Sequence, residues 1–491
     1  MNQDRAELLK ETNENVVISR GGYETLGDSS PEISRYSGQT KTFPQYVAAL
    51  TATLTAFLAG MVLGWTSPMM DSLFAGNFNH LTISTSQMGW IGSFATLGAM
   101  TMCIPTGFVC DLIGRKKTLL AISIPFIIGW LLILFSKSVI YLYLGRLISG
   151  MGFGASCVAA PIYISEISEK QIRGTLGSYF QLMIASGILA SYVAGTFMAP
   201  LSFTIFCAGL PFLFIIVFLC QPESPVFLMK KGLIDEARCS LIRLRGSEAD
   251  VTEELAEIEG ILKESGQTAT SIIQTFRRYS NLKALLISFS LMLFQQFCGI
   301  NAVILYSANI FSTAGVKLND DICTIILGLT QVIATLFSSF MVDKLGRRVL
   351  MISSTLMVGL STIALAVYYT LKDRFLIDKT IMDHLNLIPI ISLGCFIIMF
   401  SIGLGPLPWI IGSEIFPPEV KSMACSGAGT LNMFSAFLIT KFFLDVSQNI
   451  GDDCSFYIFS LFSLMGTIFT YFVLPETKGK SIEDIQFELS L

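Results

Sequence analysis

Gln295-Gln296-Phe297-Cys298-Gly299-Ile300-Asn301 places three carboxamide side chains inside a long apolar run, residues 285–311. At 1.5 Å per residue, a helix over this run is long enough to cross a bilayer. Each carboxamide offers two donors and an acceptor oxygen, and hydrocarbon satisfies none of them. We therefore expect these amides to face protein or a water-filled cavity, where a ligand rich in hydroxyl groups, such as a sugar, is a suitable partner.

The composition of the whole chain is that of a membrane protein. Of its 491 residues, 52% are hydrophobic and 14% are charged, whereas soluble domains average about 25% charged residues. Twelve apolar runs are long enough to span a hydrocarbon core; they lie near residues 46–66, 87–108, 118–136, 139–163, 175–198, 201–220, 284–311, 321–342, 349–371, 386–412, 423–444 and 455–474. The sequence therefore predicts an all-α membrane protein with twelve transmembrane helices.

The first six spans and the last six carry the same motifs. Three pairs recur at equivalent span ends: Asp111-Leu-Ile-Gly-Arg-Lys116 with Asp343-Lys-Leu-Gly-Arg-Arg348, Glu166 before Arg173 with Glu414 before Lys421, and Pro222-Glu-Ser224 with Pro475-Glu-Thr477. Parallel repeats of this kind predict two homologous six-helix halves. The loops with these cations contrast with residues 67–86, which contain no Lys or Arg. The positive-inside rule then predicts cytosolic motif loops and cytosolic termini, although the cationic loop after the ninth span is an exception.

The sequence predicts five consecutive parts. They are a polar cytosolic tail without a cleavable signal peptide (1–43), the N-terminal six-helix half (44–220), a charged cytosolic loop with short amphipathic helices (221–282), the C-terminal six-helix half (283–475) and a cytosolic C-terminal tail (476–491).

Several functional classes are disfavoured by composition. The eleven cysteines show no metal-ligand spacing, and only two histidines are present. No nucleophile–base pattern indicates an enzyme, and a net charge of −4 gives no support to a nucleic-acid partner. We expect no metal, no cofactor and no obligatory protein partner; the expected partners are the lipid bilayer and a small molecule.

With these motifs in place, the chain resembles the sugar porter family of the major facilitator superfamily over essentially its whole length. The matching motifs, in order, are Gly114-Arg-Lys116, Glu166 with Arg173-Gly174, Pro222-Glu-Ser-Pro225, the Gln295–Asn301 run, Gly346-Arg-Arg348, Gly405-Pro-Leu-Pro-Trp409 with Glu414, and Pro475-Glu-Thr-Lys-Gly479. Residues 64–68 (Gly-Trp-Thr-Ser-Pro) are more similar to insect facilitated trehalose transporters and class III glucose facilitators than to classical glucose carriers. The resemblance implies the major facilitator fold around a central sugar site.

The charged motifs suggest a latch at the cytosolic side. One interpretation is that the cations only set topology, through attraction to anionic lipid. The second, more specific interpretation groups Arg115 with Glu166 and Arg173 in the first half. In the second half it groups Arg347 with Glu414 and Lys421. These pairs would hold the halves together while the carrier faces outward and break when it opens inward. The resemblance adds Glu223 and Glu476 to this network; Val226 stands where the family motif usually continues with Arg, so one tie is missing.

Helical geometry places a condition on the predicted sugar site. Gln296 and Asn301 point about 140° apart on an ideal helix, so they converge on one ligand only if the helix unwinds near Gly299. Pro406 and Pro408 remove backbone donors and should break the tenth span before Trp409, whose ring can lie on a sugar's C–H face. The predicted substrate-binding set is Gln181, Gln295, Gln296, Asn301, Gln331, Trp409 and Asn432, in which Gln181, Gln331 and Asn432 rest on the resemblance. The competing interpretation of each amide is an interhelical hydrogen bond.

Three departures from the family pattern alter the predicted pocket. Leu305 replaces the first tyrosine of the usual pair, which leaves Tyr306 as the candidate outer gate. Ser401 stands where many glucose facilitators have a glutamate, and Met433 stands where they often have tryptophan. These changes leave room for a disaccharide.

The first span argues against proton coupling. Residues 46–70 contain no Asp or Glu, and Val62 and Thr66 occupy the positions expected for the acid of proton-driven sugar porters. An uncharged cavity cannot bind and release a proton in each cycle. We therefore predict a facilitative uniporter of a hexose such as glucose, or of trehalose. The alternatives are a proton-coupled sugar symporter and a non-transporting sugar sensor, although sensors of this family usually carry long cytosolic tails.

The N-terminal tail carries one candidate address. Asp4-Arg-Ala-Glu-Leu-Leu9 fits an acidic dileucine sorting signal, which would direct the protein to endosomes or lysosomes. We expect the plasma membrane as the location, with the endosomal or lysosomal membrane as the alternative.

Overall fold

The computed structural model describes residues 41–169, 171–246, 249–267, 278–375, 385–480 and 482–490. Within these ranges the regular secondary structure is helical, and twelve helical segments are long and apolar enough to cross a membrane. Each coincides with one of the twelve spans predicted from the sequence. The dileucine pattern at residues 4–9 lies outside the described residues.

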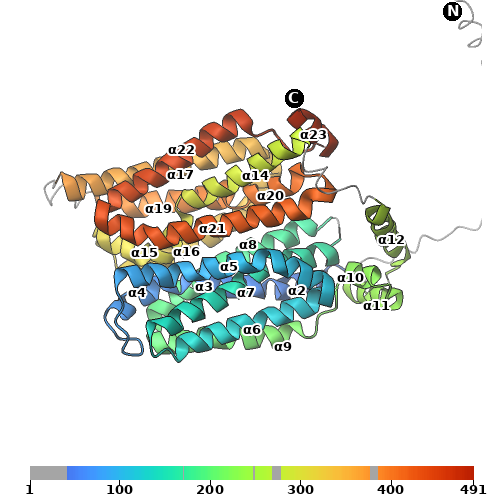
Figure 1. The fold of residues 1–491 in the computed structure, drawn as a ribbon, viewed down its shortest axis with the longest axis horizontal. Helices are drawn as coiled ribbons and strands as arrows, with labels where there is room; N and C mark the ends of the chain where they lie inside the picture. Colours follow the sequence, from blue (N-terminus) through green and yellow to red (C-terminus); the bar gives the residue numbers. More distant parts are fainter. Residues whose placement is uncertain are drawn as a thin grey trace, which may run out of the picture. The chain divides into compact units, whose positions relative to one another are not determined.

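The N-terminal half contains the first six spans (Figure 1, blue to green). The first span is built from three consecutive helices, and each of the others is one helix. The bounds are α2 (Phe43–Ala52), α3 (Leu54–Gly64), α4 (Thr66–Phe74), α5 (Thr85–Ile113), α6 (Arg115–Leu134), α7 (Val139–Ile167), α8 (Arg173–Phe197) and α9 (Pro200–Phe218).

The C-terminal half contains the other six spans, and two of these are interrupted near the middle (Figure 1, yellow to red). The seventh span is α14 (Tyr279–Phe297) followed by α15 (Ile300–Ala314), and the tenth is α19 (Ile388–Met399), the π-helix η2 (Phe400–Leu404) and α20 (Leu407–Ile415). The remaining helices are α16 (Asp320–Leu345), α17 (Arg347–Tyr369) with the π-helix η1 (Thr370–Arg374), α21 (Pro418–Ile450) and α22 (Asp452–Val473).

Short helices lie at one end of the spans, outside both halves. Between the halves run α10 (Pro225–Lys230), α11 (Ile234–Arg245) and α12 (Thr252–Gln267), and α23 (Ile482–Ser490) follows the last span. The buried Arg245 anchors α11, because its guanidinium bonds Glu254 at 2.6 and 3.0 Å and the carbonyl of Ile167 at 2.9 Å. The sequence predicted short amphipathic helices in this loop but missed Arg245 as the residue that ties them to α7.

Helix pairs that join the two halves include α5 with α21, α8 with α16, α4 with α15 and α3 with α15. Among the described residues, the hydrogen bonds between the halves lie at one end, which we call the closed end and which carries the loop of residues 75–84. Here Ser67 Oγ lies 3.0 Å from Ser307 Oγ, and the Tyr192 hydroxyl donates to the Ile304 carbonyl at 2.6 Å. The opposite end, the motif end, carries the arginine motifs; in the described part of the chain no side-chain hydrogen bond joins the halves there.

Candidate functional site

The seventh span breaks at the glycine on which the predicted site depends. α14 ends at Phe297 and α15 begins at Ile300, while Gly299 takes φ +92° and ψ +11°. Only glycine adopts this left-handed conformation without steric cost. A Cβ at this position would also lie 2.4 Å from the ring of Phe459. The unwinding that the sequence predicted is therefore present.

The break brings four carboxamides into one chain of hydrogen bonds. Asn301 Nδ2 donates to Gln296 Oε1 at 2.6 Å, and Gln296 Nε2 donates to Asn432 Oδ1 at 2.9 Å. Asn432 Nδ2 in turn donates to Gln295 Oε1 at 2.6 Å. All four side chains are buried. They come from α14, α15 and α21, so the cluster joins both parts of the seventh span to the eleventh.

The cluster ends on the broken tenth span. Gln295 Nε2 donates to the carbonyls of Leu404 and Gly405 at 3.0 and 2.6 Å. The observed break begins slightly earlier in the chain than the break predicted from Pro406 and Pro408. The α-helix ends at Met399, and the π-helix η2 follows it before α20 begins at Leu407. Ser354 holds this turn by donating to the Met399 carbonyl and accepting from the Leu404 N–H.

The other predicted site residues form no hydrogen bond to this cluster among the described residues. Trp409, on α20, is 39% exposed, and its ring faces Gly429, where a Cβ would lie 3.4 Å from it. The contact of this ring with a sugar's C–H face stays a prediction. Gln331 is buried and Gln181 is half-buried. Among the described residues, neither forms a hydrogen bond to the four clustered amides.

Tyr306 lies where the two halves meet at the closed end. Its hydroxyl donates to the Thr440 carbonyl at 2.9 Å, and its ring stacks on Phe443 at 5.7 Å. The hydroxyl also fills the space above Gly92 of α5, where a Cβ would lie 2.4 Å away. This fully buried position fits the predicted outer gate.

A second contact across the closed end was not predicted. Lys441 on α21 places its ammonium 5.1 Å from the ring centroid of Trp90 on α5, and it pairs with Asp445 at 2.6 Å. The cation therefore bridges the halves through a cation–π contact. The signal in the sequence was a lysine inside an apolar span.

A fully buried arginine in the fourth span was also missed. The guanidinium of Arg146 donates to the carbonyls of Ile91 and Val62 at 3.1 and 2.6 Å and to Thr66 Oγ1 at 3.0 Å. It also lies over the ring of Trp65. An ionisable residue inside a membrane span is expensive and usually functional. Its partners include the two first-span positions, Val62 and Thr66, that the sequence marked for their missing acid.

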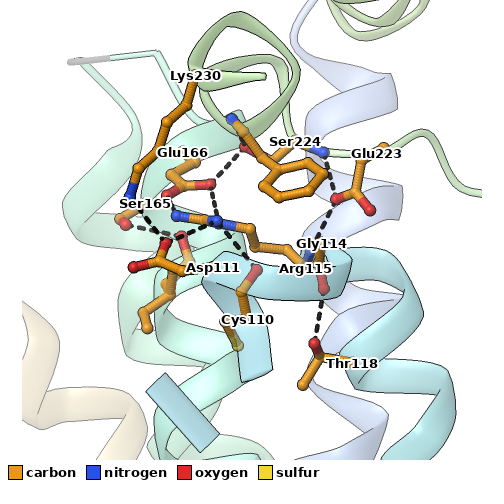
Figure 2. A network of polar contacts seen from close by, with 12 residues as sticks. Cys110, Asp111, Gly114, Arg115, Thr118, Ser165, Glu166, Glu223, Ser224 and Lys230 are labelled. Carbon is orange, nitrogen blue, oxygen red and sulfur yellow. Dashed lines mark hydrogen bonds and ion pairs between the residues drawn. The ribbon is translucent and has the colours of Figure 1, made fainter. Parts of the chain in front are cut away.

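At the motif end, Arg115 is the centre of a compact polar network (Figure 2). Its Nε and Nη2 bond both carboxylate oxygens of Glu166 at 2.8 and 2.7 Å, and its Nη1 lies 3.1 Å from Asp111. The hydroxyl of Ser224 also donates to Glu166. Bidentate pairing of this kind is the strong form of a charge-assisted hydrogen bond.

Among the described residues, Glu223 binds backbone N–H groups and pairs with no arginine side chain. It accepts from the N–H groups of Arg115 and Lys116 at 3.0 and 2.9 Å, at the N-terminus of α6. A carboxylate is stabilised there by unpaired N–H donors and by the helix dipole. Gly114, with φ +103°, makes room for it, because a Cβ would lie 2.4 Å from the Glu223 carboxylate.

The second half repeats the same arrangement. Arg347 Nη2 pairs with Glu414 at 3.2 Å, and Thr477 donates its hydroxyl to the same carboxylate. Glu476 accepts from the N–H groups of Arg347 and Arg348 at 2.9 and 3.1 Å. Burial by itself would raise the pKa of Glu476, but these donors, with the N–H of Lys478, hold that pKa below its ordinary value. The carboxylate therefore stays charged at the start of α17.

Two predicted members of the network stand apart from it in this structure. Arg173 donates to the Ser168 carbonyl at 3.4 Å. Within the described ranges, neither Arg173 nor Lys421 pairs with Glu166 or Glu414. Each ion pair joins two residues of the same half: Arg115–Glu166 lies in the first half and Arg347–Glu414 in the second. The latch between the halves therefore stays a prediction. The hydroxyls of Ser224 and Thr477 were missed, although they occupy equivalent places in the repeated motif.

Comparisons with known proteins agree with this architecture. A family model described as "Sugar (and other) transporter" matches residues 36–489. The facilitated trehalose transporter Tret1 of Culex quinquefasciatus is 34% identical over 449 residues, which cover 91% of this chain and 86% of the relative. Tret1 of Apis mellifera ligustica is 32% identical over 477 residues, which cover 97% and 93%.

Solved structures share the fold. A partially occluded, inward-open structure of the xylose transporter XylE from E. coli matches with a TM-score of 0.74 at 22% identity, covering 89% of this chain and 99% of that one. XylE bound to 6-bromo-6-deoxy-D-glucose matches with a TM-score of 0.73 at 22% identity, covering 91% and 99%. The chain therefore belongs to the sugar transporter family, and it has the major facilitator fold.

Proposed function

We propose that the protein is a facilitative uniporter that carries trehalose or a hexose down its gradient by alternating access. The amide cluster and Trp409 are proposed as its sugar site. Gln181 on the fifth span and Gln331 on the eighth span are proposed as further members of this site. The relatives named as facilitated trehalose transporters support trehalose as the first sugar to test. The departures at Ser401 and Met433 fit a pocket shaped for a larger sugar than glucose.

The contacts of Arg146 are the observation that best supports uniport over proton-coupled transport. Its guanidinium binds the Val62 carbonyl and Thr66 Oγ1, in the part of the first span where a proton-coupled carrier would place its acid. Residues 46–70 contain no Asp or Glu. Neither a carbonyl nor a hydroxyl titrates in the physiological range, so this arrangement offers no group that could load a proton with the sugar.

Uptake into proteoliposomes tests this proposal. Labelled trehalose and labelled glucose are supplied with and without an inward proton gradient. We expect at least one sugar to enter, at the same initial rate in both conditions and only to equilibrium. Accumulation above equilibrium, or a proton current that accompanies uptake, would identify a symporter. If neither sugar enters but both bind, the sensor alternative is favoured.

We expect Asn301→Ala and Gln296→Ala to weaken sugar binding without removing the protein from the membrane. A neutral hydrogen bond contributes about 0.5–1.5 kcal/mol, so each variant should bind the transported sugar roughly 2- to 10-fold more weakly. Equilibrium binding to purified protein measures this. Asn449→Ala, an exposed amide at the closed end, is the matched control. Unchanged affinity in both site variants would mean that these amides are structural.

The two ends of the molecule fit one step of alternating access. Tyr306 and the Lys441–Trp90 contact close one end, while the halves lack side-chain hydrogen bonds at the motif end among the described residues. With the orientation that the positive-inside rule predicts, the molecule is closed to the outside. We propose the plasma membrane as its location, with the endosomal or lysosomal membrane as the alternative.

A further inference from the structure

Lys441, on α21, is a buried cation at the closed end. Its side chain is 7% exposed and lies in an apolar span, where a charged residue is costly and usually functional. Its Nζ pairs with Asp445 at 2.6 Å, and it lies 5.1 Å from the ring centroid of Trp90 and 5.5 Å from that of Phe442. Asp445 and Phe442 belong to the same helix as the lysine, whereas Trp90 belongs to α5 in the other half. The ammonium is therefore neutralised within its own half and contacts the other half through an aromatic ring.

The helices α5 and α21 approach each other closely beside this contact. A Cβ at Gly89 would lie 2.9 Å from the carbonyl oxygen of Lys441 and 3.7 Å from its Nζ. A larger residue at position 89 would therefore push α21, and the lysine with it, away from the ring of Trp90. Near the ends of the same two helices, Gln448 Nε2 donates to Thr85 Oγ1 at 2.8 Å. The contact between the lysine and the ring is thus part of a tight seam between the halves.

The position of Asp445 limits what opening of the closed end costs. Asp445 lies one helical turn from Lys441 on the same helix, so the ion pair moves with α21 and stays intact when the halves separate. Opening then breaks the cation–π contact, which shifts an equilibrium about 2- to 30-fold. A buried ion pair between the halves would shift it more than about 100-fold. The weaker contact suits a carrier that must open this end in every cycle.

We propose that Lys441 is a gate residue, whose contact with Trp90 biases the carrier toward the state that is closed at this end. This inference rests on the proposed alternating access and adds a residue that sets its balance. Asp445 keeps the cation neutralised in both states, and the ring of Trp90 holds it only in the closed one. Loss of the ring or of the charge should therefore raise the ratio of open to closed molecules at this end about 2- to 30-fold.

The test is hydrogen–deuterium exchange of the purified full-length protein without sugar, measured at the backbone amides near the closed end, in residues 85–92 of α5 and 441–450 of α21. We expect Lys441→Met, which removes the charge and keeps a long side chain, to speed exchange in both segments about 2- to 30-fold. Trp90→Leu should have the same effect. Combining the two should add little, because each removes the same contact. Lys441→Arg should stay close to the native protein, since arginine also forms cation–π contacts.

Two further variants complete the design. Gly89→Ala keeps both side chains but forces α5 and α21 apart, so it should speed exchange in the same two segments. Lys137→Met is the matched control, because Lys137 is an exposed lysine on the loop that follows α6 at the closed end. Its loss should leave exchange unchanged.

The segment in α5 decides the outcome. If Lys441→Met speeds exchange in α21 alone, the lysine stabilises only its own helix and the proposal is overturned. Additive effects of Lys441→Met and Trp90→Leu would overturn it as well. If Lys441→Met cannot be purified folded, native exchange of α5 in Trp90→Leu or in Gly89→Ala contradicts the proposal, and faster exchange in both supports it. Absence of sugar transport by the native protein would refute the proposed function alone, because amide exchange is measured without sugar.

Discussion

Replacing Gly299 with alanine is expected to abolish sugar transport. Alanine in the left-handed region costs about 1–2 kcal/mol, and its Cβ would lie 2.4 Å from the Phe459 ring, in a contact that cannot form without displacement. Overpacking of this kind adds about 1–3 kcal/mol. The chain would relieve both by straightening the seventh span, which separates Gln296 from Asn301. Sugar uptake in proteoliposomes, with the thermal unfolding midpoint of the purified protein, measures the effect.

The control for this variant is Gly394→Ala. Gly394 lies in α19 of the same half, and a Cβ there would have no heavy atom within 4 Å. Alanine also favours a helix over glycine by about 1 kcal/mol, so this variant should transport normally and be no less stable. Native transport by Gly299→Ala would show that the break is not needed for the sugar site.

Replacing Arg115 with glutamine should strongly destabilise the motif end. The guanidinium bonds both oxygens of Glu166, and the two side chains are only 7% and 14% exposed. Removing one partner of a buried ion pair costs about 3–5 kcal/mol, because the remaining charge is left uncompensated. We expect a lower thermal unfolding midpoint and a severe loss of transport. The midpoint of the purified variant and its initial rate of sugar uptake report the two effects.

Two further variants separate the ion pair from the general positive charge of this loop. Lys117→Gln removes an exposed cation two residues away and should leave the midpoint nearly unchanged. In Arg115→Gln combined with Glu166→Gln no buried charge is left alone, so much of the lost stability should return. A double variant as unstable as the sum of the two single variants would show that Arg115 and Glu166 act independently.

The twelve spans, the two-fold repetition and both helix breaks could be predicted from local sequence. A span is recognised by a run of apolar residues about as long as the bilayer is thick. A break is recognised by residues that cannot continue a helix: Gly299, and Pro406 with Pro408. The pairing of Arg115 with Glu166 could also be predicted, because the repeated motifs place both at equivalent span ends. The structure shows all of these features.

Which polar groups meet each other was decided by tertiary structure. Glu223 lies 108 residues from Arg115 and binds its backbone N–H instead of its side chain, and Gln295 finds its acceptors 109 and 110 residues away, in the tenth span. Arg146 could be suspected from its charge, but its partners come from two other spans, the first and the second. A sequence pattern identifies a buried group that needs a partner, because hydrocarbon supplies none. The partner itself depends on how the helices pack, since the donor and the acceptor lie on segments far apart in the chain.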